Sequence, residues 1–279
     1  MTIRETLPRD SSRLAAALQL DASSARIEVQ CLFQAVLKVN RAYLLTHPER
    51  VLDANESARY AELLNRRLQG EPIAYLLGAR EFYGLDFKVT PATLIPRPDT
   101  ELLVELALQR IPRGGCVLDM GTGSGAIALS IAHVRSDVAV VAVDASVAAL
   151  AVATENARRL RTNNVRLLQS DWFSAFADER FDVIVSNPPY IEADDPHLSQ
   201  GDVRFEPREA LVSGSDGLDD IRRIISFGKD HLTSGGWLML EHGYDQAERV
   251  RQLMHQAGFL DVSSLRDLAG IERVTIAHA

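Results

Sequence analysis

Cysteine is scarce in this chain of 279 residues: Cys31 and Cys116 are the only two, and they lie far apart within apolar patterns. Two separated cysteines do not make a disulfide framework, and the seven histidines show no metal-ligand spacing with cysteine or glutamate. We therefore expect no disulfide and no metal site. Both cysteines are interpreted as small apolar core residues in a reducing compartment.

Long hydrophobic runs are also missing. No stretch approaches the roughly 18 to 20 unbroken apolar residues that a membrane helix needs. Residues 1–20 lack the continuous apolar segment of a secretory signal. These absences predict a cytoplasmic protein that does not use a membrane.

Positive charge is in deficit. The chain holds 30 Lys and Arg against 38 Asp and Glu, a formal net charge of −8. Residues 1–90 are nearly neutral, so the acidic excess lies in the C-terminal part and neither part is a basic arm. Because a nucleic-acid footprint needs clustered lysine and arginine, this balance argues against direct binding of nucleic acid.

The N-terminal quarter of the chain has helical periodicity. One apolar helix face follows possible caps at Ser23 and Ser24, and a second begins near Asn55 or Ser57 and stops at Gly70. Helices this short bury little surface alone and must pack on one another. The pattern predicts a small helical bundle.

The periodicity then changes to that of an α/β domain. Residues 81–89 alternate around Gly84 and predict a β-hairpin, and Pro91, Pro96 and Pro98 follow as a stiff linker. Beyond the linker, apolar runs alternate with amphipathic segments, which predicts a parallel sheet with helices on both faces. The expected strands are 116–120, 138–143, 165–169, 181–186 and 237–241, then an antiparallel pair at 259–265 and 273–278. The expected helices are 101–110, 146–160, 217–232 and 245–257.

A glycine-rich loop follows the first expected strand and opens a helix. Glycines let the backbone turn tightly and let a ligand approach it, and a carboxylate at the end of the next strand can accept hydrogen bonds from ribose hydroxyls. The pattern predicts a nucleotide-like cofactor; a glycine turn that serves only helix–strand packing is the alternative. The expected site residues are Gly121, Thr122, Gly123, Ser124, Gly125 and Asp144.

The charge of Asp119 distinguishes between possible cofactors. This residue ends the first strand beside the glycine loop. A dinucleotide would place its pyrophosphate at this helix N-terminus, where a carboxylate would repel it. S-adenosylmethionine has no phosphate and carries an ammonium and a sulfonium, which a carboxylate favours. We therefore predict S-adenosylmethionine; the alternative for Asp119 is a carboxylate that stabilises the turn.

Asp171 and Trp172 follow the third strand, at the same edge of the sheet. Asp171 can accept a hydrogen bond from an adenine amine, and Trp172 can cover the adenine ring. A tryptophan packed in the core would produce the same pattern.

The tetrapeptide from Asn187 to Tyr190, Asn-Pro-Pro-Tyr, follows the fourth strand and predicts the chemical site. An amide nitrogen is a poor nucleophile, and two acceptors on its N–H groups would orient it. The Asn187 side-chain oxygen and the Pro188 carbonyl are the expected acceptors. Pro189 helps to hold the geometry, and Tyr190 offers a flat wall for stacking. A rigid turn with a packing tyrosine is the alternative.

The chain resembles the HemK/PrmC family of protein-(glutamine-N5) methyltransferases, which modify class I peptide-chain release factors. The resemblance covers nearly the whole sequence, and the segments outside Asn-Pro-Pro-Tyr carry most of its specificity, because that tetrapeptide also occurs in some adenine-N6 methyltransferases. It rests on GEPIAYLLG (70–78), REFYG (80–84), TLIPRPDTE (93–101), DMGTGSGAIAL (119–129), SDWF (170–173), VSNPPYI (185–191), VRFEP (203–207) and LEHG (240–243).

The resemblance implies a Rossmann-like, seven-stranded class I methyltransferase domain with a small N-terminal helical bundle and a hairpin linker. We expect the bundle, for substrate docking, at 1–77, the linker at 78–98 and the methyltransferase domain at 99–279. S-adenosylmethionine would contact 121–125, Asp144, Trp172 and Asn187. The tetrapeptide would hold the glutamine of a release factor's Gly-Gly-Gln loop, and the protein is expected to be a monomer.

Three further residues have open roles. Arg97 either contacts a ligand or pairs with Asp99 or Glu101, and Glu206 either touches the substrate or stabilises a turn. His242 is expected to be a buried, hydrogen-bonded histidine.

Three functions are weighed from the sequence. Methylation of a release-factor glutamine is the favoured one. Adenine-N6 methylation suits the tetrapeptide equally well, but a duplex substrate would need base flipping and a basic surface. A non-catalytic module that binds S-adenosylmethionine is the third.

Overall fold

The computed structural model describes residues 2–279, which form two compact units. The first contains the chain up to Gly78 together with His197–Phe205, and the second contains Ala79–Pro196 and Glu206–Ala279. The sequence had given no sign that 197–205 joins the first unit. The boundaries predicted from the sequence stay a prediction.

The first unit is a helical bundle, and two of its long helices have an aspartate as N-cap. Asp21 Oδ1 accepts hydrogen bonds from the backbone N–H groups of Ser23 and Ser24, and Asp53 accepts from Glu56 N–H. The caps expected at Ser23 and Ser24 are therefore wrong by two or three residues, whereas the second helix starts at Ala54, near the expected Asn55. A carboxylate also complements the positive end of the helix dipole. The helices are α1 (Ile3–Leu18), α2 (Ala22–Leu37), α3 (Arg41–Thr46), α4 (Ala54–Leu68) and α5 (Ile73–Leu77).

A buried polar contact lies inside this bundle. The Tyr60 ring stacks on Phe33 with 4.4 Å between centroids, and its hydroxyl donates to Asp10 Oδ2 at 3.0 Å. Burial opposes ionisation of Asp10, but hydrogen bonds from Arg9, Tyr60 and Arg13 outweigh it and hold the pKa of this carboxyl below its usual value. The contact therefore joins α1 to α4 through a charged group that needs all its donors.

The segment 197–205 is attached to the bundle through Arg67 and Arg204. Arg67 is buried and donates to both oxygens of Glu28, at 2.6 and 3.0 Å, and to Asp202 Oδ1 at 2.9 Å. Arg204 donates to the Gln69 carbonyl at 2.8 Å. Arg67 Nη1 also donates to the Gly70 and Glu71 carbonyls, at 3.2 and 3.0 Å, so Asp202 adds a charged partner to a guanidinium that the bundle already holds.

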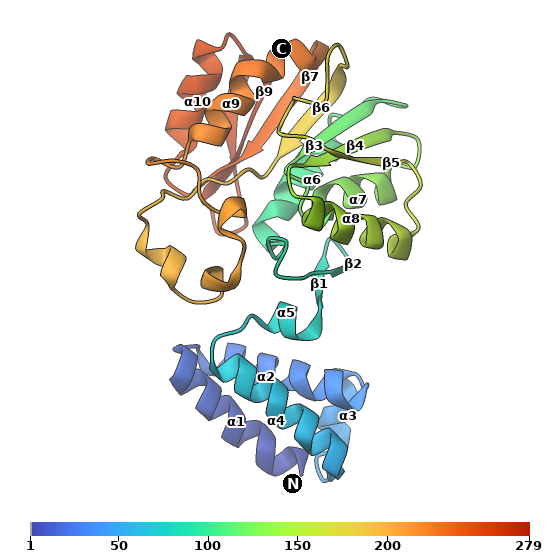
Figure 1. The fold of residues 1–279 in the computed structure, drawn as a ribbon, viewed down its shortest axis with the longest axis vertical. Helices are drawn as coiled ribbons and strands as arrows, with labels where there is room; N and C mark the ends of the chain where they lie inside the picture. Colours follow the sequence, from blue (N-terminus) through green and yellow to red (C-terminus); the bar gives the residue numbers. More distant parts are fainter. Residues whose placement is uncertain (1) are drawn as a thin grey trace. The chain divides into compact units, whose positions relative to one another are not determined.

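The second unit is built on a seven-stranded sheet with the order β5-β4-β3-β6-β7-β9-β8 (Figure 1). The first five strands in this order run parallel to one another, and β9 pairs antiparallel with β7 and β8. The strands are β3 (Cys116–Met120), β4 (Ala139–Asp144), β5 (Val165–Gln169), β6 (Phe181–Ser186), β7 (Leu232–Glu241), β8 (Leu260–Arg266) and β9 (Glu272–His278).

Helices cover both faces of this sheet (Figure 1). Successive residues of β3 show why, because Val117 packs into the core on one face and Leu118 into the core on the other. Side chains of a strand alternate between faces, so a strand that is apolar throughout is buried on both sides. On one face lie α6 (Glu101–Leu108), α7 (Ala126–Val134) and α8 (Val147–Leu160); on the other lie α9 (Asp219–Gly228) and α10 (Ala247–Gln256).

The predicted α/β class is confirmed, with small shifts at the element ends. Strand β7 begins at Leu232 instead of residue 237, because Leu232 pairs with Phe181 before the register shifts. Gly235 and Gly236 lie inside it and conceal the strand pattern. Helix α9 is shorter than predicted, since residues 229–231 tighten into a 3₁₀ turn.

The predicted hairpin forms from β1 (Ala79–Phe82) and β2 (Leu85–Lys88). Its two turn residues, Tyr83 and Gly84, have φ values of 53° and 73°, and such positive values match the twist of a two-residue hairpin. Asn156 on α8 accepts from Lys88 N–H and donates to its carbonyl, at 2.7 and 2.9 Å. The hairpin is therefore fixed to the sheet unit. Among residues 2–279, no helix is both long and apolar enough to cross a bilayer.

We predict that Tyr60→Phe destabilises the protein by about 1–3 kcal/mol, because it leaves the buried Asp10 carboxylate one donor short. Urea denaturation followed by circular dichroism measures the change. Tyr244→Phe is the matched control, since this tyrosine is 70% exposed and its change should cost less than about 0.5 kcal/mol. Equal effects of the two substitutions would contradict the prediction.

Candidate active site

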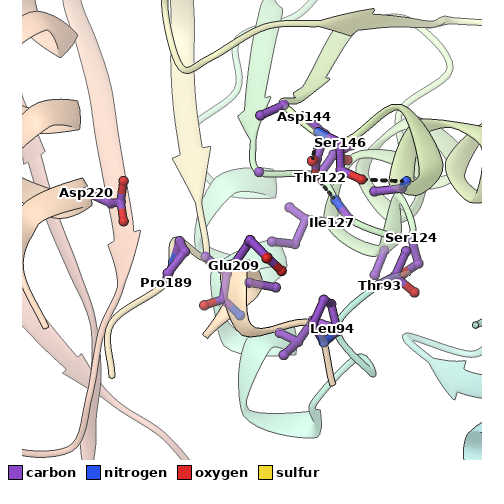
Figure 2. Close-up of a pocket in the computed structure, with 18 of the residues that line it drawn as sticks. Thr93, Leu94, Thr122, Ser124, Ile127, Asp144, Ser146, Pro189, Glu209 and Asp220 are labelled. Atoms are coloured by element: carbon purple, nitrogen blue, oxygen red, sulfur yellow. Dashed lines mark hydrogen bonds between the residues drawn. The ribbon is translucent and has the colours of Figure 1, made fainter. Parts of the chain in front are cut away.

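A cavity of about 390 Å³ lies at the carboxyl ends of β3, β4 and β6, and its size is typical of small-molecule sites. The strand order changes direction between β3 and β6, which is where open α/β sheets bind ligands. Figure 2 shows Thr122, Asp144 and Ser146 together on one side of the pocket, with Pro189 and Asp220 on the other. The cavity thus collects side chains from both halves of the sheet.

The glycine loop forms one wall of this cavity. Gly121 and Gly123 have φ values of 71° and 57°, in the left-handed region that favours glycine. Thr122 N–H donates to the Val143 carbonyl at 2.9 Å, and Asn156 on α8 donates to the Ser124 carbonyl at 2.9 Å. The loop is therefore held from the neighbouring strand and from a helix before any ligand arrives.

Asp144 ends β4 and connects the loop to the next helix. Its Oδ2 accepts from Gly123 N–H and its Oδ1 from Ser146 N–H, both at 2.8 Å. Burial raises the pKa of this carboxyl, and these two hydrogen bonds lower it. A carboxylate can accept about four hydrogen bonds, so two positions remain for hydroxyl groups of a ligand in the cavity.

Asp119 lies behind the loop and does not line the cavity. It is fully buried; Oδ2 accepts from Thr122 Oγ1 at 2.6 Å and from Ala128 N–H at 3.2 Å, and Oδ1 has no hydrogen-bond partner. Burial raises the pKa of Asp119 to about 7. A cation in the cavity would favour its ionised form.

Trp172 stands against the glycine loop and is held by α9. Its indole N–H donates to Asp220 Oδ1 at 3.2 Å, and a Cβ on Gly121 would lie 3.7 Å from the indole ring. Asp171 is exposed, and its two carboxylate oxygens accept hydrogen bonds from the two Nη atoms of Arg223, at 2.9 and 2.7 Å. Both residues line the cavity, but Asp171 must share its oxygens between Arg223 and any ligand.

The Asn187 side chain enters the cavity wall from the end of β6. Its Nδ2 donates to Thr100 Oγ1 at 3.2 Å, whereas its Oδ1 is buried and has no hydrogen-bond partner. A buried acceptor without a donor is rare and indicates a place for an N–H group of a ligand. Thr100 itself is buried at the start of α6.

The rest of the tetrapeptide is held rigidly beside Asn187. Tyr190 N–H donates to the Leu211 carbonyl at 3.2 Å, and Gln246 Nε2 donates to the Tyr190 carbonyl at 2.9 Å. Pro189 lines the cavity, while Pro188 and Tyr190 do not. Burial, with the nearby charge of Glu241, raises the pKa of Tyr190, which keeps its hydroxyl neutral.

Arg97 and Glu206 pair with each other. The Arg97 guanidinium hydrogen-bonds Glu206 Oε1, and Ile95 N–H donates to Glu206 Oε2 at 3.0 Å. Glu206 is buried, so the pair fixes the loop after 206 to the segment that precedes α6. The partners proposed for Arg97 from the sequence, Asp99 and Glu101, were wrong, because sequence proximity could not indicate a contact across more than a hundred residues.

His242 is buried and hydrogen-bonded, as predicted. Its Nδ1 contacts the Gly243 carbonyl and its Nε2 contacts Thr275 Oγ1, each at 2.9 Å. Burial lowers its pKa, so the ring is a neutral structural group. Within residues 2–279, no group of three or more His, Cys, Asp or Glu side chains is arranged to hold a metal ion.

The structure brings most of the predicted site residues to one cavity. Those that line it are Gly121, Thr122, Gly123, Ser124, Asp144, Asp171, Trp172, Asn187 and Pro189. Those that do not are Asp119, Gly125, Pro188 and Tyr190. The sequence assigned no role to Thr100, Asp220 or Arg223, which also line it. Of these three, only Thr100 could have been found from the sequence, because it lies in TLIPRPDTE, one of the segments on which the family resemblance rests.

Comparison with known proteins identifies the family. Residues 11–78 match the PrmC N-terminal domain, and residues 98–203 match the methyltransferase small domain. A release factor glutamine methyltransferase of Salmonella typhimurium is 52% identical over 91% of this chain and 92% of its own. One from Burkholderia pseudomallei is 51% identical over 99% of this chain and 98% of its own.

The chain belongs to the release factor glutamine methyltransferase family. It is therefore an S-adenosylmethionine-dependent methyltransferase, and the resemblance noted from the sequence is confirmed. A methyltransferase of Pyrococcus furiosus has the same fold, with a TM-score of 0.55 and 21% identity over 78% of this chain and 98% of its own. At that identity the likeness concerns the fold alone.

S-adenosylmethionine fits the groups around the cavity. Asp144 has acceptor positions left for the ribose hydroxyls, and Trp172 offers a ring face. Asp144 in the lining and Asp119 behind the loop supply the negative charge that a sulfonium and an ammonium favour.

We predict that the affinity for S-adenosylmethionine rises with pH through about 7 and then levels off. The pKa of Asp119 is about 7 without ligand, and a bound cation favours the carboxylate, so binding releases a proton. Titration calorimetry in buffers of different ionisation heat measures both the affinity and the proton release. Asp119→Asn should show weaker binding and lose this pH dependence. If Asp119→Asn keeps the same pH dependence of affinity, that dependence comes from another group.

Proposed function

We propose that this enzyme transfers a methyl group to the side-chain amide nitrogen of the glutamine in the Gly-Gly-Gln loop of class I release factors. The observation that supports it most is the buried Asn187 Oδ1, an acceptor without a donor on a residue that lines the cavity. A substrate amide that donates one N–H to this oxygen would satisfy it. The family relatives, named for the same reaction, support the same substrate.

The chemistry of an amide explains why such an acceptor is needed. The nitrogen lone pair is delocalised into the carbonyl, so the nitrogen attacks poorly unless it is oriented and its electron density is raised. We assign Asn187 Oδ1 as one acceptor and the Pro188 carbonyl as the second. Pro188 and Tyr190 are next to Asn187 in the chain but do not line the cavity themselves. We propose that Tyr190, whose backbone is fixed on both sides, is a wall for the planar group. Catalysis is then chiefly positioning in a water-poor site.

We assign the opposite wall to the methyl donor. Bound S-adenosylmethionine supplies an electrophilic methyl group on a sulfonium. Asp144 would orient the ribose and Trp172 would cover the adenine, while the glycine loop, prearranged by Asn156, lets the donor approach the backbone. The charge of Asp119 favours a cation over a dinucleotide with its pyrophosphate.

We assign docking of the release factor to the helical bundle at 1–77, joined by the linker at 78–98 to the methyltransferase domain at 99–279. The match of residues 11–78 to the PrmC N-terminal domain supports a separate role for the bundle. We further propose a cytoplasmic monomer that does not bind nucleic acid directly. The net charge of −8 supports the last point.

Labelling with a radioactive methyl donor tests the substrate. Intact release factor should become labelled, and a release factor whose loop glutamine is changed to alanine should not. Duplex DNA and RNA in parallel reactions test adenine methylation. Equal labelling of the two release factors, or labelling of nucleic acid in preference, would refute the proposal.

We predict that Asn187→Ala lowers kcat by about 10² or more, because it removes a preorganised polar contact to the reacting group. Asn163→Ala is the control, since this asparagine is exposed on the loop after α8. Single-turnover rates with saturating release factor measure the chemical step. Wild-type rates in Asn187→Ala would remove this residue from the mechanism, whatever the substrate.

A further inference from the structure

Trp172 has a backbone conformation that is rare for a bulky residue. Its φ is 50°, in the left-handed region that favours glycine. Ser170 Oγ donates to the Trp172 carbonyl at 2.7 Å and so fixes the turn. A strained residue of this kind persists where the surrounding structure determines its conformation. The indole is therefore expected to be held by specific contacts.

The indole ring is held at both ends. Its N–H donates to Asp220 Oδ1 at 3.2 Å. The opposite edge of the ring, Cζ3 and Cη2, faces Gly121, where a Cβ would lie 3.7 and 3.8 Å away. Gly121 belongs to the glycine loop, and Asp220 lies in the first turn of α9. The ring thus extends from the loop to the helix, and one hydrogen bond fixes its angle at the helix end.

Asp220 is itself oriented by Ser213. Ser213 Oγ donates to Asp220 Oδ2 at 2.7 Å and accepts from Asp220 N–H at 2.8 Å. Ser213 is 2% exposed, and its N–H donates at 2.9 Å to the carbonyl of Ile191, the residue after the Asn-Pro-Pro-Tyr tetrapeptide. This reciprocal pair orients the carboxylate, which presents Oδ1 to the indole. The acceptor for Trp172 is therefore attached to the segment that follows the tetrapeptide.

Arg223 makes a second contact from α9 to the same segment. It donates to Asp171, the residue before Trp172, and it lies three residues after Asp220, on the same face of the helix. The side chains of Arg223 and Asp171 are 47% and 57% exposed. An ion pair as exposed as this one contributes little. Asp220 is therefore the residue of α9 whose loss should affect Trp172 most.

We propose that Asp220, oriented by Ser213, is a positioning residue that holds the Trp172 indole over the adenine of S-adenosylmethionine. The inference rests on the proposed function through the assignment of Trp172 to the adenine. It adds that the Asp220 carboxylate serves as a hydrogen-bond acceptor for the indole, and not as a charge that attracts the sulfonium. Asp220 acts through Trp172 and does not touch the reacting atoms.

The affinity for S-adenosylmethionine, measured by titration calorimetry at constant pH, tests this role. Asp220→Ala removes the acceptor of the indole N–H, so Kd should rise about tenfold or more. Asp220→Asn keeps a side-chain oxygen for the indole, so its Kd should stay within about threefold of the wild-type value. Asp230→Asn is the control and should change nothing, since Asp230 is exposed in the turn after α9.

The kinetics of methylation should show the same division. KM for S-adenosylmethionine should rise in Asp220→Ala, while kcat at saturating donor should fall less than about threefold, because the Asn187 acceptor is untouched. A loss of stability alone would leave this KM unchanged in the folded variant.

A second ligand separates hydrogen bonding from charge. S-adenosylhomocysteine has the same adenine but no sulfonium. If Asp220 positions the indole, Asp220→Ala should weaken the binding of both ligands by the same factor. A loss confined to S-adenosylmethionine and shared by Asp220→Asn would show that the charge acts directly, and it would overturn the proposal.

A double-mutant cycle tests whether Asp220 acts through Trp172. Trp172→Phe removes the indole N–H, so Asp220→Ala added to it should cause no further loss of affinity. Equal losses from Asp220→Ala in the two backgrounds would contradict the proposal.

Fluorescence reports on the indole without any ligand. The sequence holds two tryptophans, so Trp172 is the only one left in Trp237→Phe protein. In that background Asp220→Ala should make the emission easier to quench with acrylamide, whereas Asp220→Asn should not. Unchanged quenching in folded Asp220→Ala would overturn the proposal. If Asp220→Ala does not fold, Asp220→Asn decides: a Kd raised more than about threefold contradicts the proposal, and a smaller change supports it.

The outcomes distinguish this role from the proposed function. If the wild type labels release factor and folded Asp220→Ala keeps its affinity for the methyl donor, the role of Asp220 is wrong and the function stands. If the wild type does not label release factor but the affinities change as expected, the function is wrong and the role of Asp220 stands.

Discussion

The proposed chemistry depends on one buried acceptor, the Asn187 side-chain oxygen. The Asn187 side-chain nitrogen donates to Thr100 Oγ1 at 3.2 Å, and the oxygen is buried with no hydrogen-bond partner. An unsatisfied buried acceptor costs roughly 1–3 kcal/mol, which a folded protein tolerates where a ligand will complete the bond. The unpaired oxygen thus favours a ligand that can donate a hydrogen bond to it.

The same constraint explains why the fold surrounds this position with fixed backbone. The Asn156 side chain joins the hairpin, at Lys88, to the glycine loop, at Ser124. Gln246 and Leu211 fix Tyr190 from two other elements. In the proposed reaction the methyl donor and the substrate nitrogen must be positioned closely. Rigid backbone on both walls of the cavity would hold them in that position and so raise the rate. The sheet supplies that rigidity through strands buried on both faces.

The sequence predicted the sheet well because its strands are apolar throughout and its loops carry glycine. Strands 116–120, 165–169 and 181–186 lie where their β-branched runs indicated. It could not predict contacts between residues distant in the chain, such as Arg97 with Glu206 or Trp172 with Asp220, because nothing local in the sequence records them.

The segment 197–205 shows how the two units depend on one chain. Pro196 and Glu206 belong to the sheet unit, and the residues between them belong to the bundle unit, where Asp202 pairs with the buried Arg67. Glu206 directly follows this segment and is hydrogen-bonded to Arg97. The next residues include three that line the cavity, Pro207, Glu209 and Ala210. The residues that border the cavity are therefore joined covalently to a segment that packs with the bundle. The bundle, which we propose docks the release factor, has a direct chain connection to the cavity.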